Sequence, residues 1–558
     1  MKDKRLRHAG AILLCSLLLA ILAACSSQNG NDGEKSANKP NNETIVEDVE
    51  NSAGGEPAAA SYAVDEQPGK VYYEIFVRSF YDTNGDGIGD LNGVTAKLDY
   101  LKELGIGGIW LMPINASPSY HGYDTTDYYA VNPEYGTLDD LKKLLEEAHK
   151  RDIKIIMDLV VNHTSKEHPW FKEALADEKS PYRSWYTFAN PDEKVRADGA
   201  VGGDPWHSYG SLNYLGVFWE GMPDLNFDEP KVREEMIKIG QYWLEQGLDG
   251  FRLDAAKHIY GDFASTAITP EIQAKNKAWW QEFRAGMTKV KPDAYLIGEV
   301  WDSLTVIAPY FDQALNSAFH FDIAGRLLSA ADKEQDADLA FSLGRAYGVY
   351  EKSSGGTFVD APFLSNHDQN RVMTVLNGNL DHAKMAAAML LTLPGTPYLY
   401  YGEELGLKGA KPDEYIREPM PWYGSQDGGE GQTTWEKPRY NPDPGAVSVE
   451  AQTQDEQSML NHYRELIKWR NEEAALRDGG IAEFKLELAN QKLSVYVRAI
   501  AKERVLVVHN LSGEEQTTDL QPSEVFGSFE ELTRSTGSGA KLDGGKLTLP
   551  PYSTVIIK

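Results

Sequence analysis

The sequence predicts an α/β protein built on a (β/α)8 TIM barrel, with a domain inserted after the third strand and a C-terminal antiparallel β-sandwich domain. Three observations favour this fold class. Short β-rich runs alternate with amphipathic helical segments, and several of the runs are almost continuously apolar, as a parallel sheet covered by helices requires. Eight such units follow one another before residue 477. Polar residues collect where these strands end, as they do in barrel enzymes. An open doubly wound sheet is the alternative that the alternation alone leaves open.

Residues 1–24 have the features of a secretory signal peptide. Four basic residues precede an uncharged run of sixteen positions, Ala9–Ala24, which is short for a membrane-spanning helix. The run ends in Leu-Ala-Ala-Cys and resembles the bacterial lipobox, in which the cysteine is lipidated and becomes the first residue. We therefore expect lipidation at Cys25 and an outward-facing membrane anchor. An ordinary signal peptide with a chance cysteine is the alternative.

Residues 25–68 are rich in Ser, Asn, Gly, Glu, Pro and Ala. Such a segment buries too little apolar surface to fold, so we expect a flexible linker behind the anchor. The remaining chain has globular composition, with 41% hydrophobic residues overall. Its 84 acidic residues exceed its 55 basic ones, for a formal charge of −29. This charge repels phosphate backbones, so nucleic acid is excluded as a partner, and the membrane is expected to be reached only through the lipid.

The barrel is expected to occupy residues 69–163 and 229–477. Segments 94–104, 138–151 and 230–246 carry apolar residues at helical spacing. The expected strands lie at 71–80, 107–114, 154–161, 249–255, 294–301, 317–323, 357–365 and 396–402.

Two further domains are expected outside the barrel. The insertion 164–228 interrupts the third unit and contains 12 aromatic residues, which either pack a small domain B or stack on sugars. Residues 478–558 contain alternating runs such as KLSVYVRAI and RVLVVHNL. These runs indicate an all-β C-terminal domain.

Carboxylates stand at the ends of three expected strands. Asp254 ends the fourth strand, Glu299 the fifth, and Asp368 follows the seventh. Glycosyl transfer uses such a set, because one carboxylate attacks the anomeric carbon while a protonated one supplies the leaving oxygen with a proton. Arg252 precedes Asp254 by two residues, so both side chains point to one face of the strand. An adjacent cation keeps a nucleophile ionised, which favours Asp254 as nucleophile and Glu299 as acid/base.

Four ordered motifs resemble the signature regions of the α-amylase family, glycoside hydrolase family 13. They are DLVVNH, GFRLDAAKH, GEVW and FLSNHD, and the resemblance spans residues 69–558. It implies retaining hydrolysis or transfer at α-glucosidic bonds. By the same resemblance, Asp254 is the nucleophile, Glu299 the acid/base and Asp368 the transition-state stabiliser.

The resemblance also implies the residues that bind sugar. The −1 subsite, which holds the sugar that is attacked, would be lined by His163, Arg252 and His367, with Tyr123 stacking beneath the ring. Lys257 and His258 would reach sugars on the leaving-group side.

Local features narrow the expected activity by resemblance. MPDLN at 222–226 is similar to a form intermediate between oligo-1,6-glucosidases and neopullulanases. Ala255 follows the nucleophile where α-1,6-specific relatives usually carry Val. Tyr120 stands where exo-acting relatives carry the Asp that grips a chain end. We therefore expect an endo-acting α-amylase that cleaves α-1,4 bonds in starch and maltooligosaccharides.

A loop after the first strand has the spacing of a calcium site. Oxygen-bearing residues alternate around a glycine turn, as at the start of an EF-hand loop, and the resemblance adds a backbone carbonyl as a ligand. The expected Ca²⁺ ligands are Asp82, Asn84, Asp86, Ile88 and Asp90. A plain Asp/Asn/Gly turn is the alternative. A second family site would use Asn162, a domain-B Asp and His258, but Asn226 stands where many relatives have the Asp.

Two other functions are left open. One is a neopullulanase-like, oligoglucosidase-like or transglycosylating enzyme, which the acceptor subsites decide. The other is a catalytically inactive glucan-binding lipoprotein, which the presence of all three acids disfavours. The expected partner is an α-glucan, and the protein is expected to be a monomer.

Overall fold

The computed structural model describes residues 70–190, 200, 203–261, 269–425, 428–501 and 503–558. The expected signal peptide, linker and lipidated Cys25 lie outside the described residues. Within the described ranges, no helix combines the length and the apolar character needed to cross a membrane.

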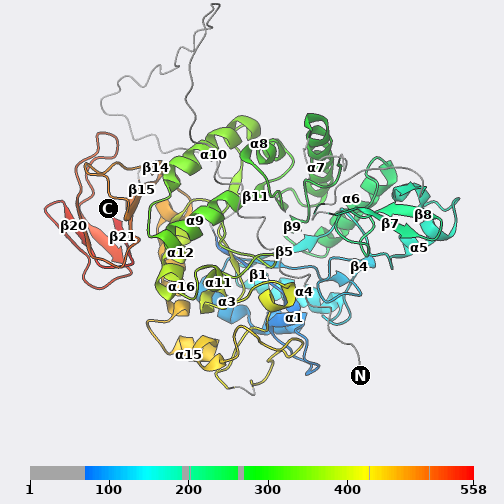
Figure 1. The fold of residues 1–558 in the computed structure, drawn as a ribbon, viewed down its shortest axis with the longest axis horizontal. Helices are drawn as coiled ribbons and strands as arrows, with labels where there is room; N and C mark the ends of the chain where they lie inside the picture. The colour runs from blue at the N-terminus through cyan, green and yellow to red at the C-terminus, as the bar shows by residue number, and fades with distance from the viewer. Residues whose placement is uncertain (1–69, 191–199, 201–202, 262–268, 426–427, 502) are drawn as a thin grey trace, which may run out of the picture. The chain divides into compact units, whose positions relative to one another are not determined.

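Eight parallel strands form the barrel within the described part of the chain (Figure 1). They pair in the order β12-β11-β10-β9-β5-β2-β1-β13, and a parallel bridge between Phe363 and Tyr398 joins the two ends of this order. The barrel fold predicted from the sequence is confirmed, and each expected strand contains one of these eight. Their bounds are β1 Tyr72–Ile75, β2 Gly108–Leu111, β5 Lys154–Leu159, β9 Gly250–Leu253, β10 Tyr295–Gly298, β11 Ser317–Phe319, β12 Val359–Ala361 and β13 Tyr398–Tyr400.

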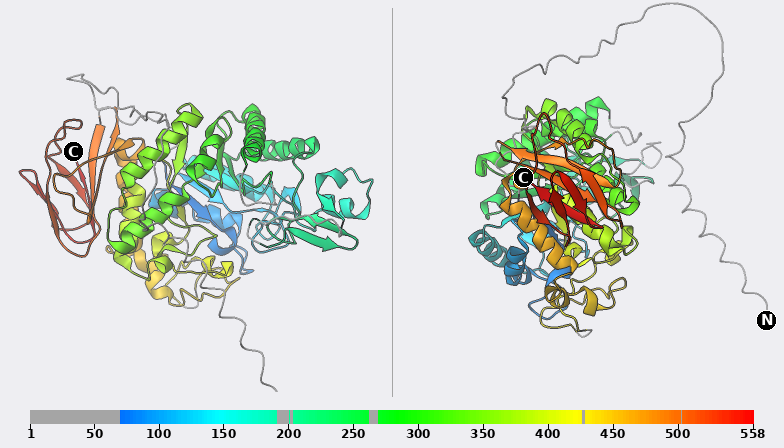
Figure 2. Two further views of the ribbon diagram at one scale, coloured as in Figure 1. Left: turned by 45° about the horizontal axis from the view of Figure 1, so that its top comes forward. Right: turned by 90° about the vertical axis from the view of Figure 1, so that its left-hand side faces the viewer.

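Helices surround the strands, as the two further views also show (Figure 2). The long ones are α4 Leu138–Lys150, α6 Pro230–Glu245, α7 Pro270–Val290, α9 Phe321–Lys333, α10 Leu339–Ser354, α12 Leu380–Thr392 and α16 Met459–Glu472. Helix α4 begins with a capping box between Thr137 and Asp140, which satisfies backbone donors at its first turn.

Two expected elements differ in extent from the structure. The strand expected over 71–80 ends at Ile75, and the helical turn α1 Val77–Phe80 follows. The helix expected over 94–104 is two helices, α2 Leu91–Ala96 and α3 Leu98–Leu104, which meet at Lys97. Residues 71–80 are buried throughout, Glu74 and Arg78 included, and burial alone does not distinguish a strand from a helical turn.

The barrel interior is filled by large side chains. Tyr72 stacks on Tyr398 with ring centroids 5.1 Å apart, and Trp110 packs on Phe319 at 5.3 Å. Side chains two positions further along the strands also point inward, which places Glu74 of β1 and Asp158 of β5 nearer the carboxyl ends. This filled core supports a layer of buried polar groups above it.

Domain B is inserted between β5 and α6. It contains helix α5 Pro169–Ala176 and a small antiparallel sheet of β6 Phe188–Ala189, β7 Trp206–Tyr209 and β8 Leu212–Leu215. Several of its aromatic residues pack on one another, as Trp170 and Trp185 do at 4.7 Å. A bridge between His163 and Asp224 joins the domain to the end of β5.

The described residues after 477 form two antiparallel sheets, in agreement with the predicted β domain. One sheet has the order β14-β15-β16-β21-β18 and the other β17-β20-β19, and Val508 and Leu547 belong to one core cluster between them. The strands are β14 Gly480–Glu483, β15 Leu493–Ile500, β16 Glu503–Asn510, β17 Gln516–Asp519, β18 Leu532–Ser535, β19 Lys541–Asp543, β20 Lys546–Leu549 and β21 Ser553–Ile557.

Candidate active site

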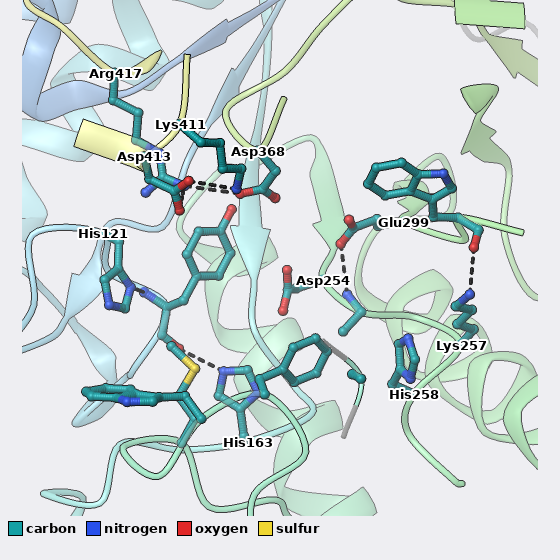
Figure 3. Close-up of a pocket in the computed structure, with 17 residues that line it drawn as sticks. His121, His163, Asp254, Lys257, His258, Glu299, Asp368, Lys411, Asp413 and Arg417 are labelled. Carbon is teal, nitrogen blue, oxygen red and sulfur yellow. Dashed lines mark hydrogen bonds and ion pairs between the residues drawn. The ribbon is translucent and has the colours of Figure 1, made fainter. Parts of the chain in front are cut away.

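A pocket of about 880 Å³ lies at the carboxyl ends of the barrel strands. Figure 3 shows the side chains of Asp254, Glu299 and Asp368 pointing into it from three directions. The structure therefore brings the three predicted acids together. Predicted residues that line the pocket with them are Tyr123, His163, Lys257 and His258.

Arg252 connects the carboxylates at the base of the pocket. Its Nη1 donates to Asp158 Oδ1 at 2.8 Å and to Asp254 Oδ1 at 2.6 Å, and its Nη2 donates to Glu299 Oε2 at 2.7 Å. The arginine side chain is only 1% exposed. One planar guanidinium thus fixes three carboxylates, and the expectation that Arg252 and Asp254 share a face is confirmed.

Burial and Arg252 act on these acids in opposite directions. Burial raises the pKa of Asp254 and of Glu299, and the cation of Arg252 opposes the rise in both. Burial also raises the pKa of Asp158 to about 7, again against Arg252. The raised pKa of Glu299 favours the protonated form that a general acid needs.

The turn after β9 places the two central acids side by side. Ala255 has φ of 47°, in the left-handed region that a non-glycine residue seldom adopts. Its N–H donates to Glu299 Oε2 at 3.3 Å. This strained residue turns the chain directly after Asp254 and orients Glu299 from the backbone.

Asp368 lies among cations on the opposite side of the pocket. Its Oδ2 is 3.0 Å from His367 Nε2, and its Oδ1 accepts a hydrogen bond from Arg417 Nη2 at 3.1 Å. Burial raises the pKa of Asp368, but His367 and Arg417 outweigh burial and lower it. Asp368 is therefore ionised when substrate enters.

Tyr123 lines the pocket and contacts His367 and Asp158. Its ring stacks on His367 with centroids 5.5 Å apart and an interplanar angle of 13°. Its hydroxyl donates to Asp158 Oδ2 at 3.0 Å and lies 2.6 Å from His367 Nε2. The stacking on His367 and the two contacts of the hydroxyl hold the Tyr123 side chain in place beside Asp158 and His367.

Phe218 of domain B packs between two histidines of the pocket, His163 and His258, which are both neutral. Burial lowers the pKa of His163 and of His258 to about 4. Phe218 packs against His163 at 5.6 Å and against His258 at 5.5 Å. Trp219 beside it lines the pocket and is 47% exposed.

Lys257 and His258 lie on the Glu299 side of the pocket (Figure 3). Lys257 Nζ donates to the Trp301 carbonyl at 2.6 Å and to Asp302 at 3.0 Å. The Trp301 ring is 53% exposed and stacks on Phe321 at 4.5 Å with an interplanar angle of 5°. This side therefore presents a flat, supported aromatic face next to the acid.

The opposite side is built by a loop that the sequence motifs do not cover. Asp413 pairs with Lys411 at 2.7 Å and with Arg417 at 3.2 Å, and Figure 3 shows all three beyond Asp368. Sequence reasoning missed these residues because they follow the eighth strand, far from any motif. Trp301 could have been found, since it belongs to GEVW.

The predicted calcium loop forms a series of short turns. Asp82 Oδ1 accepts from the N–H of Asn84 at 3.0 Å, Asn84 Oδ1 from Asp86 at 2.9 Å, and Asp86 Oδ1 from Ile88 at 2.8 Å. Asp90 also caps helix α2, which the sequence did not suggest. These oxygens are the type that Ca²⁺ prefers. However, no group of three His, Cys, Asp or Glu gathers for a metal among the described residues.

The second set of expected ligands has a different arrangement. Asn162 Nδ2 donates to Asp224 Oδ1 at 3.3 Å, whereas Asn226 donates to the Ser184 carbonyl at 3.0 Å. The carboxylate next to Asn162 is therefore Asp224, two residues before the position that the resemblance indicated.

The fold and this site define an α-amylase-type glycosidase. The family model "Alpha amylase, catalytic domain" matches residues 74–479, and "Alpha-amylase SusG C-terminal domain" matches 493–556. The chain belongs to the α-amylase family and is a glycoside hydrolase of that family.

Individual relatives agree with this assignment. The chain is 42% identical to "Alpha-amylase 3" of Dictyoglomus thermophilum over 88% of its length and 93% of the relative. It is 35% identical to a "4-alpha-glucanotransferase" of Thermotoga maritima, over 79% and 96%. A crystal structure of an α-amylase from H. orenii matches with a TM-score of 0.79 and 44% identity, covering 88% of this chain and 99% of that one.

Proposed function

We propose that the protein is an endo-acting α-amylase that hydrolyses α-1,4-glucosidic bonds with retention of configuration. The observation that carries this proposal is the shared guanidinium of Arg252, which holds Asp254 and Glu299 next to each other in one pocket. A nucleophile and a proton donor are both required within reach of one glycosidic bond.

The reaction follows from the positions of the acids. Glu299 lies on the side of Lys257, which contacts the Trp301 carbonyl. It donates its proton to the glycosidic oxygen as the bond to the anomeric carbon breaks. Asp254 attacks that carbon and forms a covalent glycosyl ester. Glu299 then takes a proton from a water molecule, which attacks the same carbon and releases Asp254.

Asp368 and its cations act on the flattening sugar. The ionised Asp368 can accept hydrogen bonds from sugar hydroxyls that strengthen as positive charge develops on the ring. Because His367 and Arg417 already hold this carboxylate, little reorganisation is needed at the transition state.

Endo action is supported by the surroundings of Tyr120. This residue stacks on Trp435 at 5.5 Å, and the cation that could have paired with an acid there, Arg417, is bound by Asp413 and Asp368. No carboxylate occupies position 120 to bind a non-reducing end. Internal segments of a glucan chain can then enter the pocket.

The test is product analysis on maltoheptaose and on maltoheptaoside blocked at its non-reducing end. We expect cleavage of both by the purified protein and, for Asp254→Asn, loss of nearly all turnover with glucan binding retained. Trimming of the unblocked sugar alone would contradict endo action. Near wild-type turnover in Asp254→Asn would contradict the nucleophile assignment.

Glycosyl transfer is a second candidate, favoured by one observation. The exposed Trp301 ring, held flat by Phe321, offers an acceptor sugar a stacking surface next to Glu299. Products longer than the maltoheptaose supplied would identify transfer. If every product is shorter than maltoheptaose, the enzyme hydrolyses and does not transfer.

We further propose that Ca²⁺ binds loop 82–90, and that lipidated Cys25 anchors the protein on the outer face of the cell membrane. Calcium there would neutralise the acidic oxygens of the loop. The loop packs on residues 431–434, where the Asp82 N–H donates to the Gly431 carbonyl and the Thr434 N–H donates to the Gly87 carbonyl.

The lipid proposal rests on the N-terminal sequence. Incorporation of labelled palmitate that is lost in Cys25→Ser would test it.

A further inference from the structure

Glu74 is a buried acid that has no role in the proposed reaction. It lies on β1, pairs in register with Trp110 of β2 and Tyr400 of β13, and is 1% exposed. It shares the inner face of β1 with Tyr72, whose ring belongs to the core below. Glu74 therefore lies one layer nearer the pocket than the aromatic core.

The carboxylate of Glu74 contacts a sugar-site histidine directly. Its Oε1 is 2.5 Å from His367 Nδ1, and the other ring nitrogen, Nε2, is 3.0 Å from Asp368 Oδ2. A neutral imidazole has one N–H, whereas an imidazolium has two. Only the imidazolium can donate to a carboxylate at both ends.

The remaining neighbours fix the direction of Nε2. Tyr123 stacks on the ring and places its hydroxyl 2.6 Å from Nε2, and this hydroxyl donates onward to Asp158 of β5. Trp110 meets the ring edge-on at 5.5 Å. Because the Tyr123 hydroxyl donates its hydrogen to Asp158, its oxygen can accept from the Nε2–H that also faces Asp368, so the two oxygens share this one donor.

Charges from several elements surround His367, which is 0% exposed. Burial lowers the pKa of His367, but Asp368 and Glu74 outweigh burial and raise it to about 10. The other titratable or charged groups around it are Tyr123, Asp158 on β5, Arg252 and Asp254 at the end of β9, Glu299 after β10, and Arg417, whose Nε donates to the His367 carbonyl.

We propose that Glu74 is a positioning residue of the sugar subsite, whose carboxylate holds His367 as an imidazolium directed at Asp368. Asp368 then remains an ionised acceptor before substrate binds. The importance of this state for turnover rests on the proposed function, but the ionisation state does not.

Three variants separate charge from shape. Glu74→Gln keeps the size and an accepting oxygen but removes the charge, and Glu74→Asp keeps the charge on a shorter stem. Tyr73→Phe is the matched control, because it removes a buried hydroxyl on the same strand that contacts Glu404 and not His367. The full chain is labelled with ¹³C in the histidine rings, and His367→Ala assigns the signal.

We expect the wild-type His367 signal to be that of an imidazolium from pH 6 to pH 9. In Glu74→Gln the midpoint falls by at least one unit, a tenfold weaker proton affinity, while Tyr73→Phe follows the wild type and Glu74→Asp lies between. The alkaline limb of kcat/KM on maltoheptaose moves to lower pH in Glu74→Gln, moves less in Glu74→Asp, and stays in place in Tyr73→Phe.

Two results would overturn the proposal: a neutral His367 in the wild type at pH 7, or equal midpoints in Glu74→Gln and wild type. If Glu74→Gln does not fold, the proposal is still tested by the charge state of His367 in the wild type and by the His367 midpoint of Glu74→Asp. If the NMR titration is as expected but the protein does not hydrolyse glucans, the result contradicts the proposed function and leaves the role of Glu74 in the ionisation of His367 intact.

Discussion

Replacing Arg252 with Met tests the charge arrangement on which the site depends. The substitution leaves Asp158, Asp254 and Glu299 buried without the cation that contacts all three. Removing one partner of a buried ion pair costs about 3–5 kcal/mol. Because three carboxylates lose their partner at once, we expect the free energy of unfolding to fall by the upper part of that range, about 4–5 kcal/mol.

The loss should depend on pH in a defined direction. A buried acid whose folded pKa is raised contributes most to stability when protonated, and the contribution is lost as pH rises through the folded pKa. Asp158 already has a pKa raised by burial to about 7, against the effect of Arg252. The variant should therefore be less destabilised at pH 5 than at pH 8.

Activity should fall as well, since Arg252 lowers the pKa of Asp254 against burial. Without the cation the nucleophile holds its proton to higher pH, so the acid limb of kcat moves to higher pH. The released carboxylates also lose their fixed positions, and a misplacement of about 1 Å can cost about 10²-fold in rate. We expect at least that loss at pH 7.

Urea denaturation at the two pH values and the pH profile of kcat on maltoheptaose measure these effects. The control is Arg470→Met, because Arg470 is buried but donates to the carbonyls of Leu391, Leu393 and Gly395. It should lose stability without moving the acid limb. An unchanged acid limb in Arg252→Met, or equal destabilisation at both pH values, would refute the reasoning.

Three other predictions follow from the pocket and the loop. Glu299→Gln should lower kcat on maltooligosaccharides by about 10²–10⁴-fold and less on an α-glucosyl fluoride, whose leaving group needs no proton; equal losses would argue against its role as acid. Trp301→Ala should leave stability unchanged, since the ring is 53% exposed, and should raise KM and reduce transfer products; an unaltered product pattern in chromatography would count against an acceptor surface. Chelation by EDTA should lower the thermal midpoint if Ca²⁺ binds loop 82–90, because a ligand at 100 times its Kd stabilises by about 2.7 kcal/mol; the same EDTA effect in Asp86→Ala would exclude this loop as the site.

The sequence by itself determined the barrel and the central acids. Strand and helix periodicity, which depends on neighbouring residues, located all eight barrel strands. The two-residue strand period placed Arg252 and Asp254 on one face, where their side chains are 2.6 Å apart. The same local spacing could not show where β1 ends, because a buried apolar run suits a strand and a helical turn equally.

Only the tertiary structure decided which distant residues complete the site. Glu74 and His367 are 293 positions apart. They meet because β13 pairs with β1 on one side and, through the bridge between Phe363 and Tyr398, with the chain after β12 on the other, and His367 follows β12. Arg417 reaches Asp368 from a loop 49 residues later, with no local pattern to indicate it. The sequence motif pointed to position 226 for the domain-B ligand of a second calcium site. In the folded chain, the carboxylate beside Asn162 is that of Asp224. Spacing along a strand is fixed by backbone geometry, but contacts across the barrel depend on its closure and on the paths of the loops above it.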